Sequence, residues 1–205
     1  MKRTLLALFL FTSVFSFAQT TTSSKSTPFV QFGVKGGVNL ADVKTDLYPN
    51  HDSRLDFHAG VLGHIHLSRH VALQPEVVYS RQGFEQMISS NLDLNMKLDY
   101  INIPVLFQYM NRGFRIETGP QVGFLVNAKG ELSNGEIDDL NDFIKPIDFS
   151  WDFGLSYLSA IGLGISGRYN LGVSNINDKI TLAGVNNTEM NNRVWQFGLF
   201  YQFRR

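Results

Sequence analysis

The stretch that decides the fold of this chain is its last one, Arg193-Val-Trp-Gln-Phe-Gly-Leu-Phe-Tyr-Gln-Phe203. From Trp195 onward every second residue is large and apolar, and the residues between are mostly small or polar, apart from Phe200. A period of two indicates a β-strand with one apolar face. Aromatic rings stand at both ends of that face, as in a strand that crosses a membrane with its rings at the two headgroup levels. A strand of a soluble sandwich has the same period, so the rest of the chain must separate these two interpretations.

Seven further segments alternate in the same way, with apolar side chains on one face and small, polar or charged side chains on the other. The connections alternate between long and short: 85–96 is a polar loop, and 128–147 is a long acidic loop with room for a helical turn near 137–144. Short turns at one end and long loops at the other are typical of outer-membrane barrels. The eight predicted strands cover residues 29–40, 55–67, 72–84, 98–109, 114–127, 148–158, 161–172 and 193–203.

Three prolines fall inside the predicted strands, namely Pro75, Pro104 and Pro120. Proline has no N–H to donate to a neighbouring strand, which counts against a strand assignment. The alternation nevertheless continues on both sides of each proline. We therefore keep the strands and expect a local bulge at each of the three positions.

The length fits a single domain, and the composition differs from that of typical soluble domains. The chain has 205 residues, and its charged fraction of 18% is below the roughly 25% that is typical of soluble domains. The formal net charge is zero and no basic patch indicates a nucleic-acid partner. The absence of cysteine excludes disulfides, thiol catalysis and cysteine-ligated metals.

Residues 1–18 have the pattern of a cleaved signal peptide. Lys2 and Arg3 are followed by an apolar run over 5–17, and Ser16 and Ala18 supply the small residues that precede a cleavage site. The run is short for a membrane-spanning helix of about 20 residues. We expect a flexible lead-in over 19–28 and a barrel domain over 29–203, because a chain without helical spans crosses a membrane only as a closed barrel.

The polar faces of the predicted strands carry charges of both signs. An eight-stranded barrel has an interior just wide enough for side chains. Opposite charges on that inner face would neutralise one another and fill the lumen, which argues against a wide pore. In a soluble, lipocalin-like barrel the same residues would face water instead. The predicted polar core of the lumen consists of Lys35, Glu76, Arg115, Glu117, Asp152 and Arg168.

One ion pair of this core follows from an assumed register. If the strands meet in a tight turn at Ala160, with Ser159 opposite Ile161, then Asp152 lies directly opposite Arg168. The same register places Gly154 opposite Ser166, Trp151 opposite Tyr169, and Leu155 opposite Ile165. The alternative is that each charge has another partner, such as Glu117 for Arg168, or water.

Two groups of residues have the types that catalysis or metal binding needs. His58, His64 and His66 share one strand face, and Glu76 on a neighbouring strand offers a further ligand. Histidines at such spacing are common in alternating strands and also serve as polar filler. His51-Asp-Ser53 has the residue types of a hydrolase triad, but a triad is defined by geometry and adjacent residues rarely face one another. We expect no catalytic, cofactor or metal site.

Four segments resemble the PorT-type outer-membrane β-barrel proteins. The resemblance runs from about residue 29 to residue 203 and includes Pro104 and Pro120. It implies an eight-stranded outer-membrane barrel, in a family named after a member that is needed for protein secretion. The pair Arg204-Arg205 departs from barrels that end on an aromatic residue. The segments are Phe32-Gly-Val-Lys-Gly-Gly-Val-Asn-Leu40, Leu98-Asp-Tyr-Ile-Asn-Ile-Pro-Val-Leu106, Gly119-Pro-Gln-Val-Gly-Phe-Leu125 and Arg168-Tyr-Asn-Leu-Gly-Val-Ser-Asn-Ile-Asn177.

These observations predict an all-β protein, an eight-stranded antiparallel up-and-down transmembrane β-barrel that follows a signal peptide. We expect a small porin-like protein of the bacterial outer membrane, with a structural or interaction role and no catalytic activity. The alternatives are an accessory component of a secretion system and a soluble lipocalin-like barrel that binds a ligand. The expected partners are membrane lipid and other envelope or secretion proteins, with no nucleic acid, and the expected state is a monomer.

Overall fold

The computed structural model describes residues 30–45, 52–89, 92–132, 135, 137–139, 144–175 and 190–203. The predicted signal peptide and lead-in lie outside these residues, as do His51 and the pair Arg204-Arg205. No helix among the described residues is long and apolar enough to cross a membrane. The strands are β1 (Val30–Thr45), β2 (Asp52–His66), β3 (Val71–Ser89), β4 (Leu92–Asn111), β5 (Phe114–Leu132), β6 (Ile137–Asp139), β7 (Ile147–Leu158), β8 (Leu163–Gly172) and β9 (Met190–Gln202).

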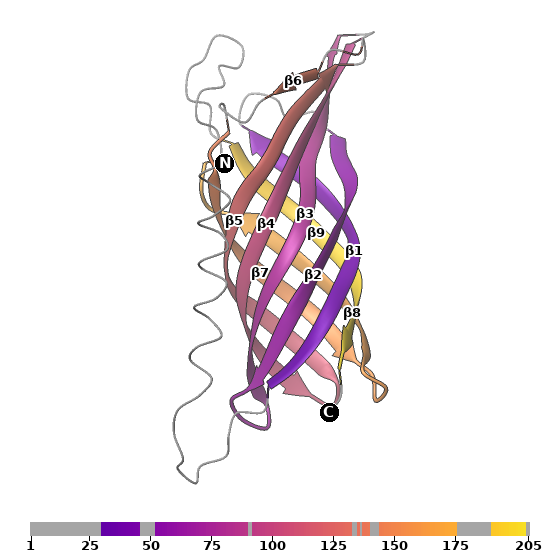
Figure 1. The fold of residues 1–205 in the computed structure, drawn as a ribbon, viewed down its shortest axis with the longest axis vertical. Coiled ribbons are helices and arrows are strands. Elements are labelled where there is room, and N and C mark those ends of the chain that lie inside the picture. The colour runs from indigo at the N-terminus through magenta and orange to yellow at the C-terminus, as the bar shows by residue number, and fades with distance from the viewer. Residues whose placement is uncertain are drawn as a thin grey trace, which may run out of the picture.

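Eight of these strands form a closed antiparallel barrel (Figure 1). Each pairs with the next along the chain, and β1 pairs with β9 to close the ring, with Val34 opposite Tyr201. Closure leaves the strands of the ring without a free edge in the membrane, which satisfies the backbone where no water is present. The short strand β6 pairs with β5 outside the ring. It includes part of the segment where the sequence left room for a helical turn, and residues 137–139 are extended instead.

The faces of the barrel are polar inside and apolar outside. On β7, Phe153 has 50% of its surface exposed, while the neighbouring Asp152 is fully buried. The same alternation runs along the other strands of the ring, where exposed Val, Leu, Ile and aromatic side chains flank buried Asn, Gln, Ser and charged ones. A soluble lipocalin-like barrel requires the reverse arrangement, so that alternative is wrong for this chain.

The strands β3, β4 and β5 project beyond the rest of the ring at one end (Figure 1). The predicted loop over 85–96 is wrong, because β3 continues to Ser89 and β4 begins at Leu92. The two strands remain paired as far as Ser89 and Leu92. Their connection is therefore short, whereas the expected alternation of loop lengths placed a long loop here. Polar composition indicated a loop, but a hairpin outside the bilayer tolerates polar residues on both faces. Strands of 19, 20 and 19 residues exceed the roughly 9–11 that span a membrane.

The prolines do not cause bulges, which corrects the sequence-based expectation. Pro75 faces Val105 and, beyond it, Val78 faces Asn102 in the same register. Register shifts occur elsewhere, between Ser53 and His58, between Met87 and Ser89, and between Asp99 and Tyr100. The physical reason is that a bulge needs an added residue, whereas proline only removes one N–H from the ladder.

The three prolines instead line up across three neighbouring strands. Pro75 of β3 faces Val105, which follows Pro104 of β4; Pro104 faces Gln121, which follows Pro120 of β5. Beside each proline the ladder lapses and then resumes in register. Between β2 and β3, pairing stops at Leu62–Glu76 and resumes at Ile65–Leu73. Between β3 and β4, it stops at Pro75–Val105 and resumes at Val78–Asn102. Between β4 and β5, it stops at Pro104–Gln121 and resumes at Phe107–Thr118. We call this row of interruptions the proline seam.

The predicted register of β7 and β8 is also wrong. Asp152 faces Asn170, and Arg168 faces Gly154. The assumed turn left only Ala160 between paired residues, which is too short to reverse a chain. The structure closes the hairpin with three residues, 160–162, between Ser159 and Leu163, and Gly162 takes a φ of 90°. Three-residue loops of this kind place a glycine at the left-handed position. The other predicted pairs fail with the register: Trp151 faces Leu171, Leu155 faces Gly167, and Gly154 does not face Ser166.

Candidate functional site

All six residues of the predicted polar core lie in the interior. Each has at most 8% of its surface exposed, and they come from β1, β3, β5, β7 and β8. The strands position them because alternate residues of each strand point into the ring. They do not form one cluster: three surround a central arginine, one lies at the edge of this group and one lies apart.

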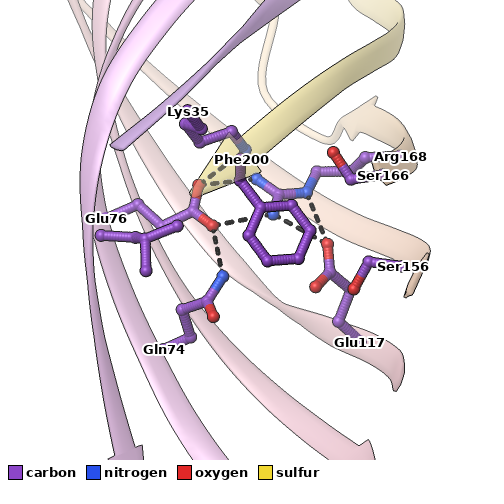
Figure 2. Close-up of a pocket in the computed structure, with 9 residues that line it drawn as sticks. Lys35, Gln74, Glu76, Glu117, Ser156, Ser166, Arg168 and Phe200 are labelled. Carbon is purple, nitrogen blue, oxygen red and sulfur yellow. Dashed lines mark hydrogen bonds and ion pairs between the residues drawn. The ribbon is translucent and has the colours of Figure 1, made fainter. Parts of the chain in front are cut away.

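Arg168 is the centre of the group (Figure 2). Its two Nη atoms donate to the two carboxylate oxygens of Glu76, each at 2.9 Å. Its Nε and Nη2 atoms also donate to Oε1 of Glu117, at 3.1 and 2.8 Å. The guanidinium of β8 thus connects strands β3 and β5 across the lumen. A planar fork that meets a carboxylate with two parallel bonds is the strong geometry for such a pair.

Both carboxylates accept further hydrogen bonds from other side chains. Lys35 Nζ donates to Glu76 at 3.0 Å, and Gln74 Nε2 donates to the other oxygen of Glu76 at 2.8 Å. Gln108 Nε2 donates to Glu117 at 2.8 Å. Burying charges is costly unless each ion is paired and hydrogen-bonded. This saturation explains how the barrel holds four charges at its centre, and we call Lys35, Glu76, Glu117 and Arg168 the charged core.

Asp152 lies at the edge of the charged core. Its Oδ1 accepts a hydrogen bond of 2.7 Å from Asn170, and its Oδ2 lies 3.8 Å from Arg168 Nη1 with no hydrogen bond. Arg168 is therefore held by Glu76 and Glu117 rather than by Asp152. The alternative that Arg168 pairs with Glu117 is correct in part, because Glu76 is a second partner. The sequence could not identify Glu76 as the main partner, because it lies on the far side of the ring.

Arg115 lies apart from the charged core, nearer to the short turns. Its Nη2 donates to Gln202 at 2.8 Å, and its guanidinium lies 5.7 Å from the centre of the Phe200 ring. Phe200 is the residue that breaks the alternation of the last strand in sequence. Only 7% of it is exposed, because the ring fills the lumen beside the charged core (Figure 2).

Glycines make room for these large interior groups. Gly164 pairs with Phe200, and a Cβ at Gly164 would lie 2.2 Å from the Phe200 ring. Gly154 pairs with Arg168, and a Cβ there would lie 2.7 Å from Glu117 Oε1. The predicted core did not include Phe200, Gly164 or Gly154, although the break in alternation at Phe200 indicates that its ring points to the inner face. A large residue on one inner face opposite glycine on the next strand is the signal that could have found them.

The space left in the centre is small. A cavity of about 10 Å³ is lined by the charged core together with Leu62, Gln74, Ser156, Ser166 and Phe200. A single water molecule needs about 10–15 Å³. Toward the long-loop end the lumen is filled by further hydrogen-bonded polar groups, among them Asp148, which accepts from Ser174 at 2.6 Å and from Asn192 at 2.9 Å.

Two of the three histidines considered as metal ligands are engaged with amide side chains. His58 Nδ1 lies 2.8 Å from Asn39 Oδ1, and His64 Nδ1 lies 3.3 Å from Gln74 Oε1. The His64 and His66 rings meet edge to face at 4.6 Å, while Glu76 belongs to the charged core. Among the described residues no three His, Asp or Glu side chains are grouped so that they could hold a metal ion. His51 of the considered triad lies outside the described residues.

The outer surface carries aromatic side chains toward both ends of an apolar band. Trp151 Nε1 donates to Thr118 Oγ1 at 2.8 Å, and Thr118 in turn donates to the carbonyl of Asp152, so the polar atoms of these two side chains are satisfied. Outer-membrane barrels have such aromatic girdles at the two interfaces. Those toward the short turns are Tyr109, Phe114, Tyr157, Tyr201 and Phe203, and those toward the long loops are Tyr79, Trp151, Tyr169 and Trp195.

The protein-family model of the outer membrane protein beta-barrel domain matches residues 17–178 of this chain. This chain belongs to that family. Among solved structures, Neisserial surface protein A is 14% identical, with 84% of this chain and 97% of that chain covered and a TM-score of 0.54. Ail of Yersinia pestis is 17% identical over 84% of this chain and 98% of its own, with a TM-score of 0.47. OprG of Pseudomonas aeruginosa is 13% identical over 87% and 98%, with a TM-score of 0.42. No curated protein sequence matches the chain.

Membership of the family agrees with the geometry of the barrel. The closed ring, the outward apolar band and the likeness to Neisserial surface protein A all describe a small outer-membrane barrel. At 14% identity, that likeness shows the fold alone.

Proposed function

We propose that this protein has a structural or interaction role in the outer membrane, that its lumen conducts no solute, and that it catalyses no reaction. The observation that supports this most directly is the charged core, which leaves a cavity of about 10 Å³ at the centre of the barrel. Glu76 and Glu117 are each held by cationic and amide donors, so neither is free to act as an acid or base.

The charged core is also costly to open. A path through the barrel requires Arg168 to leave both glutamates, and removing one partner of a buried pair costs about 3–5 kcal/mol. Phe200 would have to move as well, although it is packed against Gly164. These two obstacles favour a lumen that stays closed.

Single-channel recording tests the closed lumen. The protein is folded into planar lipid bilayers, and we expect no discrete conductance steps. The positive control is the variant E76S/E117S/R168S/F200S, in which short side chains replace Phe200 and three of the four charged residues and should open an aqueous path. Ohmic steps from the wild-type protein at low voltage would contradict the proposal.

An interaction role has an evident location, the projecting ends of β3, β4 and β5 (Figure 1). These strands are far longer than a membrane requires, whereas β8 has 10 residues. Extra strand length costs ordering entropy and adds nothing to membrane anchoring. Shortening the β3–β4 hairpin should leave the barrel folded and remove binding to a partner in the envelope. Loss of folding on shortening would show that the projection serves the barrel itself.

A second candidate is an accessory role in protein secretion. It is favoured by the four segments quoted above that resemble the PorT-type proteins, and this finer assignment rests on those segments alone. Deleting the gene and measuring secreted proteins separates the two candidates. Unchanged secretion would reject the secretion role and leave the structural or interaction role in place.

Export through a cleaved signal peptide is part of the proposal. The charged start, the apolar run and the small residues before position 19 support cleavage after Ala18. The mass of the protein purified from outer membranes should match a chain that begins at Gln19. The same sample should run at different positions on a gel before and after boiling, since closed barrels resist detergent until heated. Recovery in the soluble periplasm would contradict the placement.

A further inference from the structure

The short turns at one end of the barrel carry positive charge without negative charge. Arg69 and His70 lie in the turn between β2 and β3, and Arg112 lies in the turn between β4 and β5; all three are exposed. Neither these turns nor the turn over 159–162 contains Asp or Glu. We propose that Arg69, His70 and Arg112, which we call the basic rim, bind the headgroups of anionic phospholipids in the periplasmic leaflet.

The two turns of the basic rim adjoin one another. The backbone N–H of Met110 donates to the carbonyl of His70 at 2.7 Å, and the His70 ring stacks on Tyr109 with centres 6.1 Å apart. The β2–β3 turn therefore leans on the end of β4, two residues before Arg112. Both arginines lie on the same side of the barrel, where one or two headgroups can meet both.

The basic rim lies at the depth where headgroups are found. Tyr109 and Phe114 flank the turn that holds Arg112, and 54% and 67% of their surfaces are exposed on the lipid-facing side. Leu67 and Val71 flank the other turn and are exposed in the same way. Tyrosine rings settle at the boundary between acyl chains and headgroups. A phospholipid here would contact these side chains with its acyl chains and the arginines with its phosphate.

The charges of the basic rim are available to a ligand. Neither Arg69 nor Arg112 forms an ion pair with an acidic residue in the part of the chain that the structure describes. The outer face at the opposite end differs, because Arg81 is paired with Asp99 at 3.1 Å and Lys97 is paired with Glu131. Charge complementarity thus favours an anion at the short-turn end. Lys and Arg near a membrane surface attract anionic lipid, and the attraction falls off within a Debye length.

Arg112 occupies a position that does not suit its side chain. Its φ is 49° and that of Gly113 is 88°, so both central residues of this two-residue hairpin are left-handed. Asn-Gly and Asp-Gly are the preferred pairs for such a turn. An arginine there is less favourable for the backbone, and lipid binding would supply a reason for its presence.

The test uses the full mature chain folded into vesicles, with native mass spectrometry of the lipids that it retains on release. Wild-type protein from mixed phosphatidylcholine and phosphatidylglycerol vesicles should retain phosphatidylglycerol in preference, on the order of tenfold at low salt for two arginines. The preference should fall as salt is added. The variant R69Q/R112Q should lose it, and K129Q, which removes an exposed lysine at the opposite end, should keep it.

Further variants separate a lost site from a lost fold. Arg112→Gly removes the charge and suits the φ of 49°, so it should fold at least as well as wild type and still lose part of the preference. Arg112→Lys should keep most of it. Equal retention of both lipids by wild type, or an unchanged preference in R69Q/R112Q and R112G, would overturn the proposal.

A soluble headgroup analogue tests the contribution of the acyl chains. Glycerol phosphate has the anion without the chains and should bind the detergent-solubilised protein far more weakly than phosphatidylglycerol does. Equal binding would overturn the assignment to a lipid. Lipid binding at the basic rim does not depend on a closed lumen, so channel recordings and lipid retention test separate properties.

Discussion

Arg168 of β8 and Glu76 of β3 face each other across the lumen and share two hydrogen bonds of 2.9 Å. The pair joins strands on opposite sides of the ring, and both side chains are almost completely buried. The pair therefore joins opposite sides of the ring, which contacts between neighbouring strands cannot do.

The two side chains of this pair should be energetically coupled. We expect Arg168→Gln or Glu76→Gln alone to lower the free energy of unfolding by about 3–5 kcal/mol, because the first leaves Glu117 and the second leaves Lys35 without its buried ion-pair partner. The double variant should cost less than the sum of the two single variants. Asp152→Asn is the matched control, and its coupling to Arg168→Gln should be weaker, since the two groups are 3.8 Å apart without a hydrogen bond. Unfolding in urea from lipid vesicles measures all of these; additive effects at positions 76 and 168 would contradict the pairing.

Filling the space at Gly164 should disturb the core. A Cβ there would lie 2.2 Å from the Phe200 ring and 2.7 Å from the carbonyl oxygen of Tyr157. Overpacking of this kind costs about 1–3 kcal/mol, and we expect that loss in the unfolding free energy of Gly164→Ala. Phe200→Leu should restore part of it, because the ring causes only one of the two clashes. Gly167→Ala on the same strand is the control and should be nearly neutral, since its nearest neighbours lie 3.6 Å away. Equal effects at the two glycines would show that Phe200 is not the constraint.

A charge placed on the lipid-facing surface should destabilise the barrel more, the deeper it lies in the bilayer. Phe197 lies within the apolar band on β9, and Phe197→Arg should cost about 2–4 kcal/mol of unfolding free energy. Phe203 lies at the short-turn end of the same face, and Phe203→Arg should cost about 0–1 kcal/mol, as expected near an interface. Both side chains are exposed on the outside of the barrel, so the comparison isolates depth. A neutral result at Phe197 would mean that this strand does not face lipid.

The proline seam should be the part of the wall that opens most readily. Pro75, Pro104 and Pro120 each withhold one N–H, and pairing lapses beside each of them. Hydrogen–deuterium exchange of the folded protein in vesicles should therefore be faster in peptides that contain Val77, Ile103 and Leu106 than in peptides from the uninterrupted β8–β9 ladder. Pro104→Ala restores one donor and should slow exchange around Glu76. Equal exchange in both walls would show that other contacts compensate for the missing donors.

The alternation of residues by itself determined the architecture. A period of two assigns each residue of a strand to one face, and eight such segments with outward aromatics describe a closed membrane barrel. The same local rule placed Lys35, Glu76 and the other predicted core residues on the inner faces. It holds because the direction of a side chain depends only on the backbone immediately around it.

Tertiary structure alone decided which of those residues meet. The partners of Arg168 depend on strand stagger, on the turn at Gly162 and on the curvature of the closed ring, to which every strand contributes. A shift of two residues in one hairpin keeps each face intact and still exchanges Asp152 for Gly154 opposite Arg168. Arg168 meets Glu76 across the lumen, and no local sequence pattern indicates which residues meet over that distance. The barrel and its polar interior could therefore be predicted from the sequence, whereas the charged core, the proline seam and the basic rim depend on how the whole ring closes.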